Sequence, residues 1–299
     1  MSPLCDLCGG TAFKKEYEGL RDSALTAEGV FAIEKCNQCG LIRLSPLPEI
    51  SQVAEGYAGN YVPYRKNNFF IHAVRSFLQG RERRILKKYA SSAGSILEVG
   101  CANGEFLASF GCDGKKLLGI EMDTRSADRA RKDFGLSMFV GVFEKFNPVG
   151  NELFNLIIMR YVLEHFVSPR EALQKAHMLL SSGGFLYVSI PNYDSIERRV
   201  FGRYWHGFDV PRHLYVFTEA TIHRYASEIG FEVVSTAYDF VPNDWICSIQ
   251  RWLKEKGVGS LASFFTYKNP LLIIIFLPLS ALSCIMGSSS RFAFILKKI

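Results

Sequence analysis

The sequence lacks the features of several protein classes. It has no internal repeat and no low-complexity tract, and 21% of its 299 residues are charged while 48% are hydrophobic. These proportions are those of an ordinary globular protein, and they exclude a disordered chain, a collagen and a coiled coil. The first residues, Met-Ser-Pro-Leu-Cys-Asp, contain no basic segment followed by an apolar run. We therefore expect no secretory signal and a cytoplasmic protein.

Strong charge is also absent, except in one segment. Eight basic residues and a single acid, Glu82, lie between Tyr64 and Ala90, whereas the net charge of the whole chain is only +6. We expect residues 49–94 to form a basic helical connector. Such a segment suits an anionic partner, for example a phospholipid surface, a phosphorylated substrate or RNA, although a solvated helix face has the same composition.

Cysteine is unevenly distributed as well. Four of the eight cysteines form two Cys-x-x-Cys pairs, Cys5 with Cys8 and Cys36 with Cys39, and each pair is followed by glycine. A two-residue gap lets one turn present two thiolates, and four thiolates complete a tetrahedral zinc site. The spacing predicts a zinc ribbon over residues 1–48 that holds a structural Zn²⁺ and leaves no position for catalysis. Redox-active or uncommitted thiols are the alternative.

From Ser95 onward, short apolar runs alternate with amphipathic segments. Continuous apolar runs are typical of strands buried on both faces, so the pattern predicts an α/β fold with a Rossmann-like, mostly parallel sheet. We assign residues 95–242 plus 291–299 to this domain. The expected strands are Ser95–Val99, Lys116–Ile120, Ser137–Val142, Leu153–Met159, Phe185–Ile190, Phe231–Ala237 and Arg291–Lys298. The expected helices are Glu105–Phe110, Ser126–Phe134, Pro169–Leu180 and Glu219–Ile229.

The first of these strands leads into a glycine turn. Gly100 and Gly104 allow the backbone to pass close to a ligand, and the helix that follows offers unpaired N–H groups. Glu121 stands at the end of the next strand, 21 residues after Gly100. A carboxylate there can accept hydrogen bonds from both hydroxyls of a ribose. The pattern indicates a nucleotide-type binding site.

With these residues, the run from Ser95 to Leu296 resembles a class I S-adenosylmethionine-dependent methyltransferase. Glu98 before the first glycine and the runs Phe154–His165 and Ser182–Asn192 carry the resemblance. Together with the N-terminal cysteines, the chain resembles bacterial methyltransferases of sugar and surface-glycan biosynthesis. The resemblance implies S-adenosyl-L-methionine as cofactor. It implies that the methionine part lies at Glu98, Gly100, Cys101 and Gly104, the ribose at Glu121, and the adenine between Met122 and Phe143 with Glu144. Arg160 and Tyr161 would lie beside both the methionine part and the substrate.

Two histidines are candidates for catalysis. Methyl transfer needs mainly alignment because the sulfonium is already activated, so the protein supplies geometry and, for some acceptors, a base. His165 is the first candidate base because it follows directly on the fourth strand, and a packing role is the alternative. His213 belongs to a second polar cluster with His206, Asp209 and Arg212, which is either a substrate loop or a hydrogen-bonded loop anchor.

Two motifs of nucleic-acid base methylation are missing. Arg-Tyr-Val-Leu follows the fourth strand instead of Asn/Asp-Pro-Pro-Tyr, and Pro191-Asn192 follows the fifth instead of a Pro-Cys nucleophile. We expect the methyl acceptor to be a hydroxyl or carbon of a sugar, a glycan precursor (lipid-linked or not) or a related small metabolite. The rivals are an RNA methyltransferase that uses the zinc ribbon and the basic connector, and an inactive zinc-ribbon scaffold, which Ala102 in the glycine turn mildly supports.

A stretch of 22 residues without a charge, Asn269 to Ser290, lies near the end of the sequence. About 20 apolar residues can span a bilayer, but Pro278 divides this stretch, and a crossing would leave the final strand on the wrong side. We expect residues 243–290 to be an apolar helical insertion that lies in the membrane interface beside the basic connector. The protein would then be peripheral on the inner face of the membrane. A buried helix or a dimer contact is the alternative.

Overall fold

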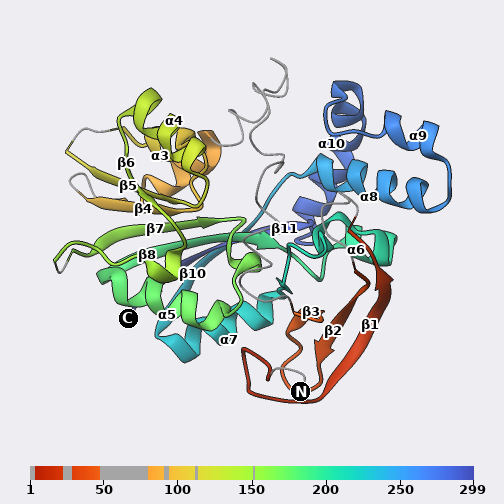
Figure 1. The fold of residues 1–299 in the computed structure, drawn as a ribbon, viewed down its shortest axis with the longest axis horizontal. Helices are drawn as coiled ribbons and strands as arrows, with labels where there is room; N and C mark the ends of the chain where they lie inside the picture. The colour runs from red at the N-terminus through yellow and green to blue at the C-terminus, as the bar shows by residue number, and fades with distance from the viewer. Residues whose placement is uncertain (1–3, 23–28, 48–79, 91–93, 112–113, 151) are drawn as a thin grey trace.

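The computed structural model describes residues 4–22, 29–47, 80–90, 94–111, 114–150 and 152–299. Over these residues the chain forms a larger and a smaller sheet, with helices on both faces of the larger one (Figure 1). Residues 80–86, near the end of the expected connector, are helical. The remainder of that connector before residue 80, including Arg65, Lys66 and Arg75, lies outside the described residues.

The larger sheet has seven strands in the order β10-β11-β8-β7-β4-β5-β6. Strands β8, β7, β4, β5 and β6 are parallel, and β11 runs antiparallel to both β8 and β10. The expected fold class, an α/β fold with a mostly parallel sheet, is therefore confirmed. The strands are β4 (Ser95–Val99), β5 (Lys116–Glu121), β6 (Ser137–Val140), β7 (Phe154–Arg160), β8 (Leu180–Pro191), β10 (Phe231–Tyr238) and β11 (Arg291–Lys298).

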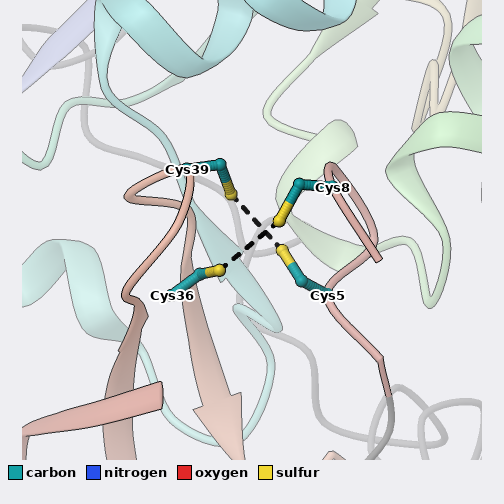
Figure 2. Close-up of side chains that lie close together, drawn as sticks. All are labelled: Cys5, Cys8, Cys36 and Cys39. Atoms are coloured by element: carbon teal, nitrogen blue, oxygen red, sulfur yellow. Dashed lines mark hydrogen bonds between the residues drawn. The ribbon is translucent and has the colours of Figure 1, made fainter. Parts of the chain in front are cut away.

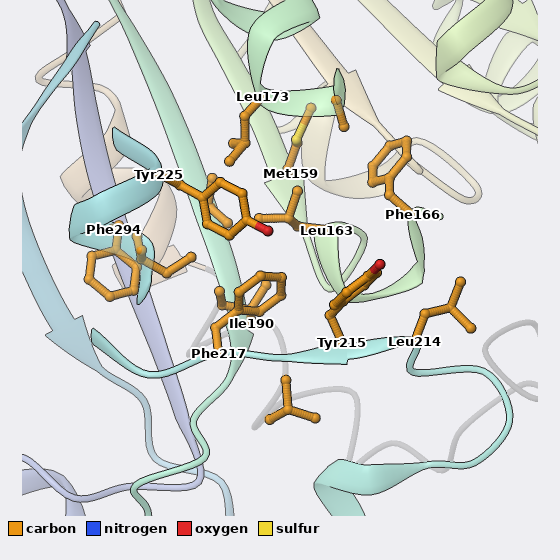
Figure 3. Close-up of a cluster of buried hydrophobic side chains, with 14 of the residues drawn as sticks. Met159, Leu163, Phe166, Leu173, Ile190, Leu214, Tyr215, Phe217, Tyr225 and Phe294 are labelled. Carbon is orange, nitrogen blue, oxygen red and sulfur yellow. The ribbon is translucent and has the colours of Figure 1, made fainter. Parts of the chain in front are cut away.

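Helices cover this sheet, and two of them begin at a residue whose side chain caps the helix. The side chain of Ser168 accepts a hydrogen bond from Glu171 N at the start of α5, and Thr218 does the same for Thr221 N at the start of α7. One face of the sheet packs against α5 and α7, where Leu173, Tyr225 and Met159 meet in the apolar cluster of Figure 3. The helices are α3 (Glu105–Ala108), α4 (Thr124–Phe134), α5 (Pro169–Leu179), α6 (Ile196–Phe201) and α7 (Glu219–Ile229).

The smaller sheet joins the N-terminal residues to the α/β part of the chain. Its strands are β1 (Phe13–Leu20), β2 (Phe31–Cys36), β3 (Ile42–Ser45) and β9 (Tyr215–Val216). Strand β9 follows the larger sheet's β8 in sequence, yet it pairs with β3, with Ile42 opposite Val216. Asp6 adds polar contacts, since it accepts hydrogen bonds from Ser168 Oγ at 2.7 Å and Tyr225 Oη at 2.6 Å. The N-terminal residues therefore share one hydrophobic core with the α/β part.

Three helices stand between β10 and β11, where the apolar stretch was expected to form an insertion. They are α8 (Pro242–Glu255), α9 (Gly259–Phe264) and α10 (Pro270–Ile285). Ile246 of α8 packs against Leu272 and Ile273 of α10. The three helices lie together at one side of the molecule, away from β4, β5 and β6 (Figure 1). Within the part of the chain that the structure describes, no helix has both the length and the apolar character needed to cross a membrane.

Candidate active site and cysteine cluster

The four paired cysteines converge on one point (Figure 2). Cys5 Sγ lies 3.4 Å from Cys39 Sγ, Cys8 Sγ lies 3.6 Å from Cys36 Sγ, and all four sulfurs lie within 4.8 Å of one another. A disulfide would bring two sulfurs to about 2.05 Å. Sulfurs at about 2.3 Å from a tetrahedral zinc ion are about 3.8 Å apart. The spacing is therefore compatible with a tetrathiolate site and too long for disulfides.

The two Cys-x-x-Cys turns repeat the same backbone geometry. Gly9 N donates to Cys5 O at 2.8 Å, and Gly40 N donates to Cys36 O at 3.0 Å. Both glycines are left-handed, with φ of 72° and 76°, which explains why glycine follows each pair. Burial raises the pKa of Cys5 to about 11. At Cys36, burial opposes ionisation, but the N–H groups of Cys39 and Gln38 outweigh it and lower the pKa to about 7.

The close packing around the turn between β4 and α3 requires glycine at two positions. Gly100 and Gly104 have φ of 68° and 74°. A Cβ at Gly100 would stand 2.7 Å from Val162 Cγ2, and one at Gly104 would stand 2.5 Å from Leu136 Cδ1. Ala102 between them is also left-handed, with φ of 52°, a conformation that is uncommon without glycine. The turn thus keeps the conformation of a glycine-rich loop although one position holds alanine.

Glu121 at the end of β5 fastens this turn to the next one. Its Oε2 accepts a hydrogen bond from Ala102 N, and its Oε1 accepts one from Asp123 N, both at 2.9 Å. Among the neighbouring residues expected at the cofactor, Cys101 is buried under β5, Met122 and Glu144 are exposed, and Phe143 is buried against Phe166. Met122 therefore offers a ligand more surface than Phe143 does.

A cluster of ionisable side chains around the buried Glu98 lies behind the turn. Glu98 is 2% exposed, and burial raises its pKa to about 8, although Arg160 Nη1 stands 3.8 Å away. Arg160 also pairs with Glu82 at 3.0 Å, and Tyr187 Oη donates to Glu82 at 2.7 Å. Sequence reasoning missed Glu82 as part of the site, although its position as the single acid in the basic segment was the available signal. Among the described residues, Glu98 Oε2 has no hydrogen-bond partner.

Tyr161 closes the end of β7 in a strained conformation. Its φ is 55°, and its N–H donates to Ser189 O of β8 at 2.8 Å. The guanidinium of Arg291 lies over its ring, 4.5 Å from the centroid. Arg291 in turn pairs with Asp244 of α8 at 3.1 Å, so the C-terminal helices are tied to this edge of the sheet. Burial raises the pKa of Tyr161 to about 12, and the phenol is neutral near pH 7.

The two candidate histidines come together beside a buried carboxyl group. His165 and His213 face each other with ring centroids 4.8 Å apart, and His213 Nε2 stands 4.0 Å from Glu164 Oε1. Each Nδ1 donates to a backbone carbonyl, that of Arg212 at 2.9 Å for His165 and that of Gly207 at 2.7 Å for His213. Both carboxyl oxygens of Glu164 are buried with no hydrogen-bond partner among the described residues. Burial raises the pKa of Glu164 to about 8, lowers that of His165 and lowers that of His213 to about 3.

Two members of the second polar cluster, Asp209 and Arg212, form ion pairs, whereas burial lowers the pKa of His206 to about 4. Arg212 Nη2 lies 2.8 Å from Asp209 and 3.1 Å from Asp22, and Arg251 Nη2 lies 2.7 Å from Asp209. Although burial opposes its ionisation, these cations hold the pKa of Asp209 well below its usual range. Because Asp209 and Arg212 pair with charged groups of the protein itself, the contacts favour a loop anchor over a substrate loop for these two residues.

A protein-family model matches the part of the chain that contains the glycine turn. The family model described as "Methyltransferase domain" matches residues 70–236. A search of curated proteins finds no match.

Similar solved structures have low sequence identity. A protein from Galdieria sulphuraria, provisionally identified as a sarcosine dimethylglycine methyltransferase, is 9% identical, with 78% of this chain and 91% of that chain covered and a TM-score of 0.52. A SAM-dependent methyltransferase from Thermotoga maritima is 22% identical, with coverage of 77% and 97% and a TM-score of 0.48. The N-methyltransferase NodS from Bradyrhizobium japonicum is 16% identical, with coverage of 77% and 98% and a TM-score of 0.44.

The likeness to the Galdieria sulphuraria protein bears on the fold alone. The family match covers more than half of the chain, including the glycine turn, Glu121 and the His165 segment. The chain therefore belongs to the methyltransferase-domain family, as a class I S-adenosylmethionine-dependent methyltransferase.

Proposed function

We propose that the protein methylates a hydroxyl or a carbon of a sugar, a glycan precursor or a related small metabolite. The observation that carries this proposal is the neutral His165 at the carboxyl edge of β7, one 3₁₀ turn after Val162, whose side chain packs on Gly100. A hydroxyl or carbon must lose a proton to become a nucleophile, so a neutral imidazole at the carboxyl edge of the sheet suits such acceptors. A neutral amine already has a lone pair and depends less on a base.

The residues around the glycine turn fit S-adenosylmethionine. Glu98 Oε2 is a buried polar atom with no hydrogen-bond partner among the described residues, and the left-handed turn brings backbone close to a ligand. Gly100, Cys101 and Gly104 would hold the methionine part with Glu98, while Glu121 would accept the ribose hydroxyls. Met122, Phe143 and Glu144 would border the adenine, and Arg160 and Tyr161 would lie beside the methionine part and the substrate. When bound, the cofactor supplies a methyl group that the sulfonium has already activated.

His165 is the stronger candidate for the base. A catalytic base works best when its pKa lies near the working pH. The pKa of His213 is lowered to about 3, so its imidazole is a weak base, and its ring is better suited to holding His165 in place. The Nδ1 proton of His165 is fixed on Arg212 O, which orients the ring.

The cysteine cluster is proposed to hold one structural Zn²⁺ through Cys5, Cys8, Cys36 and Cys39. Four thiolates around one centre carry four negative charges, which a divalent cation offsets, and they fill a tetrahedral coordination shell. We also propose that the enzyme is cytoplasmic and peripheral on the inner face of the membrane, where a lipid-linked glycan precursor would be accessible.

The proposal is tested with radiolabelled S-adenosylmethionine against nucleotide sugars, polyprenyl-linked sugars, primary amines and RNA. We expect label in a sugar-containing acceptor, and its loss in the His165→Ala variant but not in a control variant at the exposed His223. Label that enters an amine or RNA and is indifferent to His165 would contradict the proposed acceptor while leaving the methyltransferase assignment intact.

A further inference from the structure

Helix α10 is apolar on its outward side and mixed on its inward side, where Leu272 and Ile273 are buried together with two serines. Its outward side carries Leu271, Ile274, Ile275, Leu279, Leu282 and Ile285, which are 44–80% exposed. Its inward side includes Ser280 and Ser283, which are 0% and 2% exposed. A helix on the surface of a water-soluble domain turns its apolar stripe to the core and its polar residues to water. We refer to the six outward side chains as the α10 face.

The orientation of α10 is fixed by buried hydrogen bonds and by the packing of Leu272 and Ile273 on Ile246. Ser280 Oγ accepts from Val241 N at 2.6 Å, and Ser283 Oγ donates to Glu197 Oε1 at 3.1 Å. Rotating α10 to bury its aliphatic side chains would leave these buried polar groups without partners, which costs about 1–3 kcal/mol for each group. The α10 face is therefore held outward by the fold.

The two helices that precede α10 also expose large apolar side chains. Leu261 and Phe264 of α9 are about half exposed, as is Trp252 of α8. Of the 24 exposed large hydrophobic side chains in the described part of the chain, 12 fall within Trp252–Met286. Large exposed apolar patches mark surfaces that bind another apolar body. Half of these exposed side chains therefore belong to the group of helices at one side of the molecule (Figure 1).

Exposed lysines stand near the α10 face. From Lys256 to Ser290 the sequence contains two cations, Lys256 and Lys268, and no acidic residue. Lys256 and Lys268 are exposed and lie at the two ends of the α9 region. Basic residues beside an apolar surface attract anionic headgroups, with about 1 kcal/mol for each lysine near the membrane. The charge pattern therefore complements an anionic lipid surface.

We infer that the α10 face binds an anionic lipid membrane, with α10 lying in the plane of the interface. Protein interfaces are about 56–65% apolar and carry about ten hydrogen bonds, whereas the α10 face has only aliphatic side chains, which favours lipid. With 16 residues at about 1.5 Å each, α10 is about 24 Å long, shorter than a hydrocarbon core of about 30 Å. The inference rests on the proposed peripheral association and names its surface and its lipid.

Vesicle flotation tests the inference directly. The full chain should float with phosphatidylcholine vesicles that contain a quarter phosphatidylglycerol, bind pure phosphatidylcholine more weakly, and dissociate from the anionic vesicles as salt is raised. The double variant Ile275→Gln/Leu282→Gln should lose at least tenfold in partitioning. Lys268→Ser should lose about fivefold, and only on the anionic vesicles. Met178→Gln, a control at a 66% exposed methionine on α5, should bind like the parent.

Results of two kinds, from flotation and from the oligomeric state, would overturn the inference. One is flotation of the double variant equal to that of the parent, or no flotation of the parent. The other is a lipid-free dimer that the double variant dissociates, because a second copy would then cover the α10 face. Unchanged binding of S-adenosylmethionine, measured by calorimetry, shows that each variant is folded. Failure of methyl transfer to water-soluble acceptors, with flotation retained, would count against the proposed function and not against the membrane surface.

Discussion

The cysteine cluster and the group formed by Glu164, His165 and His213 are alike in the closeness of their ligand atoms and differ in their charge. Both bring potential metal ligands within 4.8 Å of one another. The cysteines gather four ionisable thiols on two identical turns, and in the thiolate form they repel one another. The carboxyl group of Glu164 has a pKa raised to about 8, and both imidazoles have a lowered pKa, so the second group is neutral near pH 7.

This difference shows that proximity of ligand atoms does not by itself define a metal site. Thiolates that converge require a cation to offset their charge. A buried carboxyl group avoids the same cost by keeping its proton. We therefore expect the cysteine cluster to bind zinc, and the group of Glu164, His165 and His213 to remain neutral without a metal ion. The predictions below test this contrast, beginning with the largest effect.

The largest effect is expected at the cysteines. The parent should contain about one zinc ion per chain, and Cys36→Ser should reduce the zinc content to near zero, because one ligand of four is lost. The variant should also unfold at a lower temperature, since Cys36 belongs to the core that the N-terminal residues share with the α/β part. Elemental analysis and thermal unfolding measure both effects.

Cys284→Ser is the matched control, because the Sγ of Cys284 donates to a backbone carbonyl, that of Tyr238, and lies outside the cluster. It should keep both its zinc and its stability. Full zinc occupancy in the Cys36 variant would show that the cluster is not the metal site.

The next effect is expected on turnover. His165→Ala should reduce kcat by about 10²–10⁴-fold, the usual contribution of a general base, and leave the affinity for S-adenosylmethionine unchanged. Its zinc content should equal that of the parent. A loss of less than about fivefold would make His165 a structural residue, and loss of a second bound metal ion would end the contrast between the two clusters.

A third effect separates cofactor binding from this histidine pair. Glu121→Ala should weaken binding of S-adenosylmethionine by about 1.5–3 kcal/mol, because hydrogen bonds to a charged group are lost and the backbone of Ala102 is released. Isothermal titration calorimetry measures this directly. Asp128→Asn, on the exposed side of α4, should bind like the parent, and equal affinity in both variants would place the ribose elsewhere.

Much of the α/β part could be predicted from the sequence, because its elements carry local signals. Helix Glu219–Ile229 and strand Arg291–Lys298 have the bounds that the sequence predicts. Thr218 and Gly230 mark the two ends of the helix. The charge of Arg291 after a long uncharged stretch marks the beginning of the strand. The glycine turn with Glu121 was also recognisable, since its spacing follows from one strand, one turn and the next strand.

Contacts between distant segments had no such signal. Strand β9 has two residues, too few to show a period, and its partner Ile42 precedes Val216 by most of the chain. Glu82 reaches Arg160 from a different element. The smaller sheet and the buried Glu82–Arg160 pair depend on tertiary packing, and a reading of local pattern therefore could not find them.

The smallest effect tests the charge of the second cluster through the pH dependence of stability. The pKa of Glu164 is about 8 in the folded protein against 4.5 for an ordinary glutamate. Between these values the folded chain keeps a proton that the unfolded chain has released, so this group's stabilising contribution is lost as pH rises toward 8. Glu164→Gln is neutral at every pH and lacks this loss. We expect the variant to gain about 1–2 kcal/mol relative to the parent between pH 6.5 and 8.5.

Urea unfolding of both proteins at pH 6.5, 7.5 and 8.5 measures the difference. This range keeps His213 out of the result, because its pKa of about 3 in the fold, against 6.5 when unfolded, makes its own contribution vary only below pH 6.5. A difference that does not change with pH would mean that Glu164 is already ionised in the folded protein. The second cluster would then carry a buried charge that needs a cation, and it would resemble the cysteine cluster after all.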